Sequence, residues 1–258
     1  MLKGIEGARM FGISDCDSTN SLMKMFREKA EPGIQSGFVL YTGYQREGRG
    51  HGGSSWESEE WKNLIFSVYY EPADVPAQRA FVISEMVSLS VKATLDGYIP
   101  DVTVKWPNDI YYRDKKIAGI LIENTVMEGR ISESIIGIGI NINQMVFMSD
   151  APNPVSLSQI TGLTYETMDI LHTFIGKFEA ESARLRSNLF DDIHRDYLRS
   201  VYRKTGYHPY QDGNGIFEAT IKDIEASGYL ALERRDGIVS RYGFKEVSYL
   251  EKKYYLCR

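Results

Sequence analysis

The chain has 258 residues, 43% of them hydrophobic and 25% charged, and its formal net charge is −5. These proportions predict a globular protein of one large or two unequal domains, and they exclude a broad basic surface for nucleic acid. No apolar run of about 18 residues occurs, the chain start is unlike a signal peptide, and the two cysteines, Cys16 and Cys257, lie far apart, so we expect a cytoplasmic protein without membrane contact.

The first predicted element is a helix over residues 21–29, preceded by the tetrapeptide DSTN at residues 17–20. Ser18, Thr19 and Asn20 are residue types that commonly cap a helix N-terminus, which is one interpretation of this tetrapeptide. The first turn of a helix also offers free N–H groups, and hydroxyl groups beside it can bind a polar ligand. The residues alone leave both interpretations open.

A predicted strand at residues 37–42 leads into a glycine-rich loop, residues 44–56, with the sequence YQREGRGHGGSSW. Backbone N–H groups in such a loop can point at one anion, and Arg49 adds a positive charge. The alternative is a flexible connector, because the loop contains neither a Walker A motif nor a dinucleotide-binding GxGxxG turn. Trp56, at the end of the loop, either covers a base or packs in the core.

Hydrophobic periodicity predicts that strands and helices share the rest of the chain up to residue 202. We expect strands at residues 64–70, 102–106, 110–112, 117–123 and 133–143, and helices at 78–97, 156–163 and, as one or two helices, 167–202. Pro107 ends one of these strands because proline cannot donate a hydrogen bond to a sheet. The elements predict an α+β fold with a mixed sheet and packed helices.

Polar clusters follow the ends of these strands, at KWPND (residues 105–109) and KKIAG (residues 115–119). Loops at strand ends carry functional residues more often than the strands themselves. A glycine inside a strand suggests that something approaches the backbone closely, and Gly119 is one such residue. The alternate residues Gly137, Gly139 and Asn141 leave one strand face without bulky side chains, so this face can floor a pocket.

After residue 203 the pattern changes to short β runs separated by glycine turns. The runs are at residues 216–224, 229–232, 238–242 and 247–250. This spacing predicts a small, barrel-like β module. We therefore expect two domains, at residues 1–202 and 203–258.

The motifs together resemble those of the biotin–protein ligase family, and they occur in the same order. They are DSTN at residues 17–20, YQxxGRG at 44–50 with a following tryptophan, KWPNDI at 105–110, KIAGILIE at 116–123 and GIGININ at 137–143. The resemblance covers nearly the whole chain. It implies a class II synthetase-like catalytic domain, a fold shared with lipoate ligases, and a C-terminal SH3-like β-barrel.

The resemblance also implies the reaction, which is that of a biotin–[biotin carboxyl-carrier protein] ligase. Biotin and ATP form biotinyl-5′-AMP, and a lysine of a biotin carboxyl carrier protein domain then takes the biotinyl group. The expected substrates are ATP and biotin, and Mg²⁺ is expected to bind with the ATP. Since the four histidines form no zinc-binding pattern, we expect no metal ligands from the protein itself.

The family motifs carry the expected site residues. Lys116, Arg49 and Asp109 are the expected catalytic residues, although Asp109 could instead only cap a turn. Biotin is expected to contact Ser18, Thr19, Asn20, Gln45, Arg49, Gly50, His51, Lys116, Gly119 and Ile120. ATP and the adenylate are expected to contact Arg49, Trp56, Lys105, Asn108, Lys116 and Asn141.

Two features depart from many family members. Where these read GRGRxGRxW, this chain reads GRGHGGSSW, so the loop carries fewer positive charges. We expect weaker retention of the adenylate, or retention that depends on protonation of His51. The DSTN motif begins at residue 17, which leaves no room for an N-terminal helix-turn-helix and predicts the monofunctional class with no role on DNA.

Two other functions remain open on the sequence. A lipoate– or octanoate–protein ligase of the same fold would use the same two steps, but its substrate tail lacks the ureido group that Ser18, Thr19, Asn20 and Gln45 could bind. A non-catalytic sensor would bind biotin or a nucleotide without modifying a carrier lysine. An exposed edge of the sheet could also pair two subunits into a homodimer.

Overall fold

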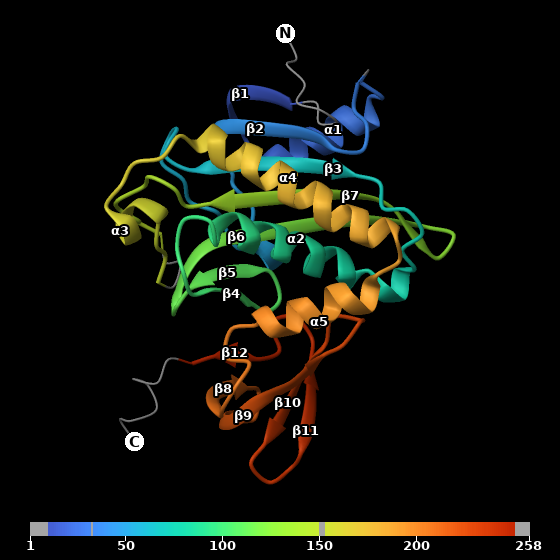
Figure 1. The fold of residues 1–258 in the computed structure, drawn as a ribbon, viewed down its shortest axis with the longest axis vertical. Coiled ribbons are helices and arrows are strands. Elements are labelled where there is room, and N and C mark those ends of the chain that lie inside the picture. The colour runs from blue at the N-terminus through green and yellow to red at the C-terminus, as the bar shows by residue number, and fades with distance from the viewer. Residues whose placement is uncertain (1–9, 32, 150–152, 251–258) are drawn as a thin grey trace.

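The computed structural model describes residues 10–31, 33–149 and 153–250. Its larger sheet has seven strands in the order β1-β2-β3-β7-β6-β5-β4 (Figure 1). β1 and β2 are parallel, and the other neighbouring pairs are antiparallel, so the sheet is mixed as predicted. The strands are β1 (Met10–Cys16), β2 (Phe38–Gln45), β3 (Leu64–Tyr70), β4 (Val102–Lys105), β5 (Asp109–Tyr112), β6 (Lys115–Met127) and β7 (Arg130–Ile140).

Helices cover both faces of this sheet, and strand β3 shows how they are divided. Phe66 packs edge-on against Phe174 of α4 (Thr167–Arg186), with ring centroids 4.9 Å apart. Its neighbour Ser67 contacts Asn20 of α1 (Thr19–Glu28). Since consecutive strand residues point to opposite faces, α1 and α4 lie on opposite sides of the sheet.

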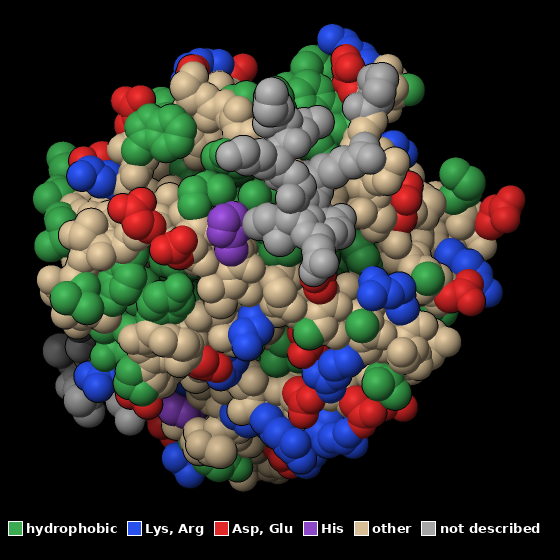
Figure 2. Space-filling view, turned by 45° about the horizontal axis from the view of Figure 1, so that its top comes forward, with side chains coloured by type: hydrophobic (Ala, Val, Ile, Leu, Met, Phe, Trp, Pro, Cys, Tyr) green, Lys and Arg blue, Asp and Glu red, His purple; other side chains and the backbone are tan. Residues whose placement is uncertain are grey.

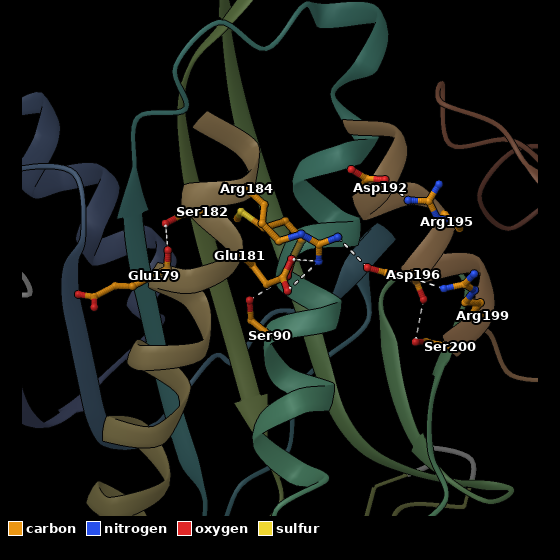
Figure 3. A network of polar contacts seen from close by, with 11 residues as sticks. Ser90, Glu179, Glu181, Ser182, Arg184, Asp192, Arg195, Asp196, Arg199 and Ser200 are labelled. Carbon is orange, nitrogen blue, oxygen red and sulfur yellow. Dashed lines mark hydrogen bonds and ion pairs between the residues drawn. The ribbon is translucent and has the colours of Figure 1, made fainter. Parts of the chain in front are cut away.

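The helical layer on the α4 side also contains α2 (Phe81–Leu95) and α5 (Phe190–Ser200) (Figure 1). A polar network ties α4 to α5, and Arg184 is at its centre (Figure 3). The Arg184 guanidinium donates to Glu181 one turn earlier, at 2.9 Å, and to Asp196 of α5, at 2.6 Å. Burial opposes the charged form, but the hydrogen bonds to these two carboxylates outweigh it and raise the pKa of Arg184 above its usual value. The charged hydrogen bonds link α4 to α5.

A second sheet follows these helices and lies beyond α5 and β4 (Figure 1). It is antiparallel, with the order β11-β10-β9-β8-β12, and a core continuous with that of the larger sheet. The indole of Trp106 donates to the carbonyl of Gly228 at 2.9 Å across the junction. Its strands are β8 (His208–Asp212), β9 (Gly215–Ile224), β10 (Leu230–Arg234), β11 (Val239–Tyr242) and β12 (Ser248–Tyr249).

The predicted α+β class with a C-terminal β module is confirmed, while two strands were not predicted. β1 exposes most of its residues, and β8 contains proline and aspartate, so neither has the apolar pattern of a strand. The predicted helix at 156–163 is the shorter α3 (Leu157–Thr161), which begins with a capping box between Ser156 and Gln159 and ends at Gly162. The domain boundary near residue 203 stays a prediction.

Within the described ranges, no helix is long and apolar enough to cross a bilayer. On the face drawn in Figure 2, acidic and basic side chains lie next to one another. The described residues on this face therefore form no continuous basic surface of the kind that binds nucleic acid.

Candidate active site

A cavity of about 210 Å³ opens on the α1 side of the larger sheet. Segments that are distant in sequence meet around it: the start of α1, the glycine-rich loop after β2, the β4–β5 turn, the facing strands β6 and β7, and the turn between β11 and β12. Most of the predicted site residues line it, namely Ser18, Thr19, Asn20, Gln45, Arg49, Gly50, Trp56, Asn108, Asp109, Lys116, Gly119 and Ile120.

Glycines form the floor of the cavity because side chains from other elements press against the strands there. A Cβ atom on Gly139 would overlap the indole of Trp56, and one on Gly119 would lie 3.0 Å from the same ring. A Cβ atom on Gly137 would overlap the amide of Asn20. The bare strand face predicted from the sequence is therefore the surface on which Trp56 and Asn20 rest.

A buried polar network lies at the start of α1. The side-chain carbonyl of Gln45 accepts hydrogen bonds from Thr19, from its backbone N–H at 2.8 Å and from its hydroxyl at 3.1 Å. The hydroxyl of Ser67 lies 2.6 Å from Asn20 Oδ1 and 2.8 Å from Thr19 Oγ1. Ser67 is fully buried and was not predicted, although a serine in the centre of the strand sequence LIFSVYY could have drawn attention to it.

Two polar groups of this region stay available to a ligand. Ser18 occupies the N-cap position of α1, but its side chain makes no capping hydrogen bond. Gln45 uses its carbonyl oxygen on Thr19, while no described residue accepts a hydrogen bond from its Nε2 amide. An amide N–H and a hydroxyl, both from nearly buried residues, are suited to bind a neutral polar group.

The predicted cations Arg49 and Lys116 each face a carboxylate. Lys116 Nζ lies 2.6 Å from Asp109, and Arg49 Nη2 lies 3.2 Å from Glu123. Glu123 also accepts a hydrogen bond from the Asn20 amide at 2.8 Å. Both cations are thus held beside the cavity and can exchange their carboxylate partners for an anionic ligand.

The β4–β5 turn is fixed to β6 by a pair of hydrogen bonds. Asn108 Nδ2 donates to the carbonyl of Ile120 at 2.6 Å, and the Ile120 N–H donates to the carbonyl of Asn108 at 2.9 Å. This pairing places Asp109 opposite Gly119 in the β5–β6 register. The two strand-end clusters of the sequence therefore form one wall of the cavity.

Two predicted site residues, Lys105 and Asn141, are not brought to the cavity lining. Lys105 donates to the hydroxyl of Tyr111 at 2.8 Å, and burial, despite the opposing effect of the nearby Asp109 charge, lowers its pKa to about 8. Asn141 is buried and donates to the carbonyl of Val155 at 3.2 Å. The side chain of His51 lies outside the described part of the structure. Their binding roles stay predictions.

The C-terminal module contributes two lining residues that were not predicted, Phe244 and Lys245. Phe244 packs on Trp106, with ring centroids 5.5 Å apart. Lys245 donates a hydrogen bond to the carbonyl of Gly52 in the glycine-rich loop. No motif marks these residues, because only the packing of the two sheets brings them to the cavity. Ser54, Ser55, Ile65, Pro107, Leu121 and Ile138 also line it.

Among the described residues, no group of three or more His, Cys, Asp and Glu side chains could hold a metal ion. Asp109 and Glu123, the carboxylates beside the cavity cations, are ion-paired. This donor set suits a divalent cation that arrives bound to phosphates better than one bound by the protein alone.

The fold and the cavity define a class of protein: an α+β domain whose mixed sheet carries a pocket lined by polar side chains and cations. Residues 12–141 match the model of the biotin/lipoate A/B protein ligase family. The chain belongs to this family, and the resemblance found in its motifs is confirmed.

Relatives with known names support the same assignment. The chain is 28% identical to the bifunctional ligase/repressor BirA of Bacillus spizizenii, over 88% of this chain and 70% of the relative. It is 29% identical to the biotin–[acetyl-CoA-carboxylase] ligase of Mycobacterium tuberculosis, over 86% of this chain and 82% of the relative. The solved biotin protein ligase from Aquifex aeolicus, in complex with biotin and ATP, shares the fold, with a TM-score of 0.76, 23% identity, and coverage of 94% of this chain and 99% of that one.

Proposed function

We propose that this chain is an ATP-dependent biotin–protein ligase, which activates biotin as biotinyl-5′-AMP and transfers it to a lysine of a carrier protein. The observation that carries the proposal is the combination of groups that line one cavity. These are the free polar groups of Ser18 and Gln45 and the cations Arg49 and Lys116. The relative from Mycobacterium tuberculosis, named a biotin–[acetyl-CoA-carboxylase] ligase, supports the same activity.

In the first step, an oxygen of the biotin carboxylate attacks the α-phosphorus of ATP, and the bond from this phosphorus to the β-phosphate oxygen breaks. Pyrophosphate leaves with the electron pair. Both reactants are anionic, so they repel one another unless cations lie between them. Lys116 and Arg49 are suited to this role, and Mg²⁺ bound to the ATP phosphates supplies further positive charge.

In the second step, the amine of the carrier lysine attacks the acyl carbon, and AMP leaves with its phosphate oxygen. Asp109 is ion-paired with Lys116 at 2.6 Å before any ligand binds. When Lys116 turns to the carboxylate or the phosphate, an oxygen of Asp109 is released and can accept the proton that the amine loses. This exchange links the binding of the acid to the availability of the base.

The mixed anhydride must be kept from water, and the geometry of the glycine-rich loop suits this purpose. The N–H of Gly50 donates to the carbonyl of Ser54 at 2.6 Å, and that of Trp56 donates to Gly48 at 2.8 Å. These bonds fold the loop back on itself, with Arg49 bridged to Ser55. A loop of this shape at the cavity can exclude solvent while the adenylate waits for the carrier.

The free polar groups of Ser18 and Gln45 favour biotin over lipoate or octanoate. An alkyl tail placed there would leave the Nε2 amide of Gln45 and the hydroxyl of Ser18 without partners in a buried site. Each unpaired group costs about 1–3 kcal/mol. The carbonyl and N–H groups of a ureido ring can pair with them.

The proposed partner is a biotin carboxyl carrier domain of a biotin-dependent carboxylase, because the relative from Mycobacterium tuberculosis is named for such a substrate. A homodimer, the absence of a role on DNA, and a cytoplasmic location are further proposals. The last of these rests on the two scattered cysteines of the sequence.

The test is incubation of the purified chain with biotin, ATP, Mg²⁺ and a carrier domain, followed by intact-mass measurement of the carrier. We expect one biotinyl group on one lysine, and none when ATP is left out. ATP–pyrophosphate exchange with biotin, lipoate and octanoate identifies the acid. Exchange supported by octanoate but not biotin would contradict the assignment, and tight binding of biotin without a modified carrier would point to a sensor.

A further inference from the structure

A second cavity, of about 290 Å³, lies between α4 and the strands β2 and β3, and we call it the α4 cavity. Its floor is formed by Val39 of β2 and by Val68 and Tyr70 of β3. Because consecutive residues of a strand point to opposite faces, Val68 lies on the opposite side of the sheet from Ser67, which contacts Asn20 beside the candidate active site. Among the described residues, the α4 cavity shares strand β3, but no lining residue, with the candidate active site.

Apolar side chains form much of the α4 cavity. Phe174, Ile175 and Phe178 of α4 face the valines of the floor. The rings of Tyr70 and Phe178 pack edge to face, with centroids 5.4 Å apart, and form one wall. An apolar cavity of about 150 Å³ is large enough to hold benzene. The α4 cavity thus has room for one aromatic ring with a short side chain, and its walls favour an apolar molecule.

A polar group without a partner lies at the α4 cavity. Tyr70 is 3% exposed, and its hydroxyl is buried without a hydrogen bond to any described residue. Burial raises the pKa of Tyr70, although the nearby Arg186 guanidinium opposes this rise, so the hydroxyl keeps its proton and can donate. A buried hydroxyl without a partner is unfavourable, and an oxygen atom of a ligand would satisfy it.

The charged residues at the α4 cavity are separated along the helix. Arg186 donates to the hydroxyl of Ser182 at 3.2 Å and has no carboxylate within 4.0 Å in the described structure, whereas Arg184 pairs with two carboxylates. Glu179 lies seven residues before Arg186, or about 10 Å along the helix axis. Figure 3 shows Glu179 and Ser182 on the side of α4 that faces away from α5. The Arg186 end of the α4 cavity therefore attracts an anion, and the Glu179 end repels one.

We propose that the α4 cavity is a second ligand site, which binds a small amphipathic monocarboxylate. The apolar part of the ligand packs on Val68 and Phe178, and its carboxylate accepts hydrogen bonds from the hydroxyl of Tyr70 and the guanidinium of Arg186. A dicarboxylate binds less well, because its second charge would lie near Glu179. The proposal is independent of the function proposed above, since it uses no residue of the candidate active site.

The experiment titrates the full chain with 3-phenylpropionate in a calorimeter, without biotin or ATP. We expect saturable binding with a Kd below about 1 mM. Arg186→Met should raise this Kd about 10-fold, as for the loss of one charge-assisted hydrogen bond. Lys177→Met is the matched control, because Lys177 is exposed on the same helix but does not line the α4 cavity. A wild-type Kd above about 1 mM, or equal changes in Arg186→Met and Lys177→Met, would overturn the proposal.

Tyr70→Phe tests the hydroxyl without disturbing the packing of the ring on Phe178. Because the hydroxyl has no partner in the protein, the variant should resist urea at least as well as the wild type. Its Kd for 3-phenylpropionate should nevertheless rise about 3- to 10-fold, since the ligand loses a hydrogen bond. An unchanged Kd would show that the hydroxyl does not contact the carboxylate, against the proposal.

The sign of the ligand charge is tested at the other end of the α4 cavity. Glu179→Gln removes the repelling carboxylate and should lower the Kd of 3-phenylpropionate by up to about fivefold. The amine 3-phenylpropylamine should not bind the wild type below about 1 mM. Binding of this amine that Glu179→Gln weakens would mean that the α4 cavity takes a cation, and it would overturn the proposal.

Lys116→Met separates the α4 cavity from the candidate active site, whose cations could also attract a carboxylate. The Kd of 3-phenylpropionate should be the same in this variant as in the wild type, because Lys116 lines only the other cavity. Loss of binding in Lys116→Met would place the carboxylate at the candidate active site and overturn the inference. Since the titration contains neither biotin nor ATP, a chain that fails to biotinylate a carrier can still bind 3-phenylpropionate as proposed here.

Discussion

The two ion pairs at the cavity differ in the structural elements that carry their cations. Lys116 and Asp109 belong to the strands β6 and β5, and their side chains are 24% and 22% exposed. Arg49 belongs to the glycine-rich loop, and it and Glu123 are 45% and 38% exposed. Partial burial strengthens the first pair, whereas solvent screens the second. We therefore propose that Lys116 acts in the chemical step and that Arg49 binds the ligand from the loop.

The largest effect is expected for Lys116→Met. Because Lys116 is held on a strand beside the reacting groups, its loss should lower biotin-dependent ATP–pyrophosphate exchange about 10²- to 10³-fold. The measurement is the exchange rate at saturating ATP and biotin. A loss of less than tenfold would mean that Lys116 does not stabilise the transition state. Lys115→Met is the matched control, since Lys115 is exposed and does not line the cavity.

A smaller and more selective effect is expected for Asp109→Asn. This variant keeps the shape of the side chain but cannot accept a proton, so transfer to the carrier should fall about 10- to 100-fold. Adenylate formation should change little, because Lys116 is then free of its carboxylate partner. Single-turnover measurement of the two steps separates them. Equal losses in both steps would assign Asp109 to the positioning of Lys116 instead.

For the Arg49–Glu123 pair we expect a gain instead of a loss: Glu123→Gln should bind the adenylate more tightly. This amide can still accept the hydrogen bond from Asn20, but it no longer competes with the ligand for Arg49. Since exposed ion pairs contribute about 0.2–1 kcal/mol, the adenylate should bind up to about fivefold more tightly. Dissociation rates of biotinyl-5′-AMP provide the measurement. Weaker binding would show that Glu123 holds Arg49 in its active position.

The smallest effect on activity is expected for Lys105→Met. Lys105 is the last residue of β4, close in sequence to Asp109, but it does not line the cavity. Burial lowers the pKa of Lys105 to about 8, below its usual value in the unfolded chain. Between these two pKa values the unfolded state binds the additional proton, so this group makes stability rise as the pH rises from about 8 to 10.5.

Removing Lys105 should therefore raise the free energy of unfolding at pH 7 and remove this part of the pH dependence. Urea unfolding of the wild type and Lys105→Met at pH 7 and pH 10 measures both effects. A variant that is less stable than the wild type at pH 7 would instead assign Lys105 a stabilising contact with Tyr111. Unchanged exchange activity in this variant would support the position of Lys105 outside the cavity.

The sequence predicted the site residues that lie in local motifs, and it missed those that only the fold brings to the cavity. Local motifs predicted the residues of the glycine-rich loop, the β4–β5 turn and β6, because each motif lies within a few residues of chain. Ser67 was missed because, although the serine stands out in an apolar strand, only the fold brings it against Thr19 and Asn20. Phe244 and Lys245 escaped because their place at the cavity depends on the docking of two sheets, which no short segment encodes.

The fold shows the same limit. Strand β3 was predicted with its observed bounds, Leu64–Tyr70, because every residue in it is buried and most are β-formers. β1 was not predicted because it pairs only with β2, at the edge of the sheet, and its mostly exposed residues need no apolar pattern. A strand of this sheet that is buried on both faces, such as β3, can thus be predicted from its apolar sequence, whereas the exposed edge strand β1 cannot.

The most direct test of the account is a crystal structure of the chain with biotinyl-5′-AMP. The account predicts the ureido ring within hydrogen-bond distance of Gln45 Nε2 and Ser18 Oγ, and the phosphate between Lys116 and Arg49, with the Lys116–Asp109 contact broken. A ligand bound elsewhere, or an adenylate in this cavity with Lys116 still paired to Asp109, would contradict it.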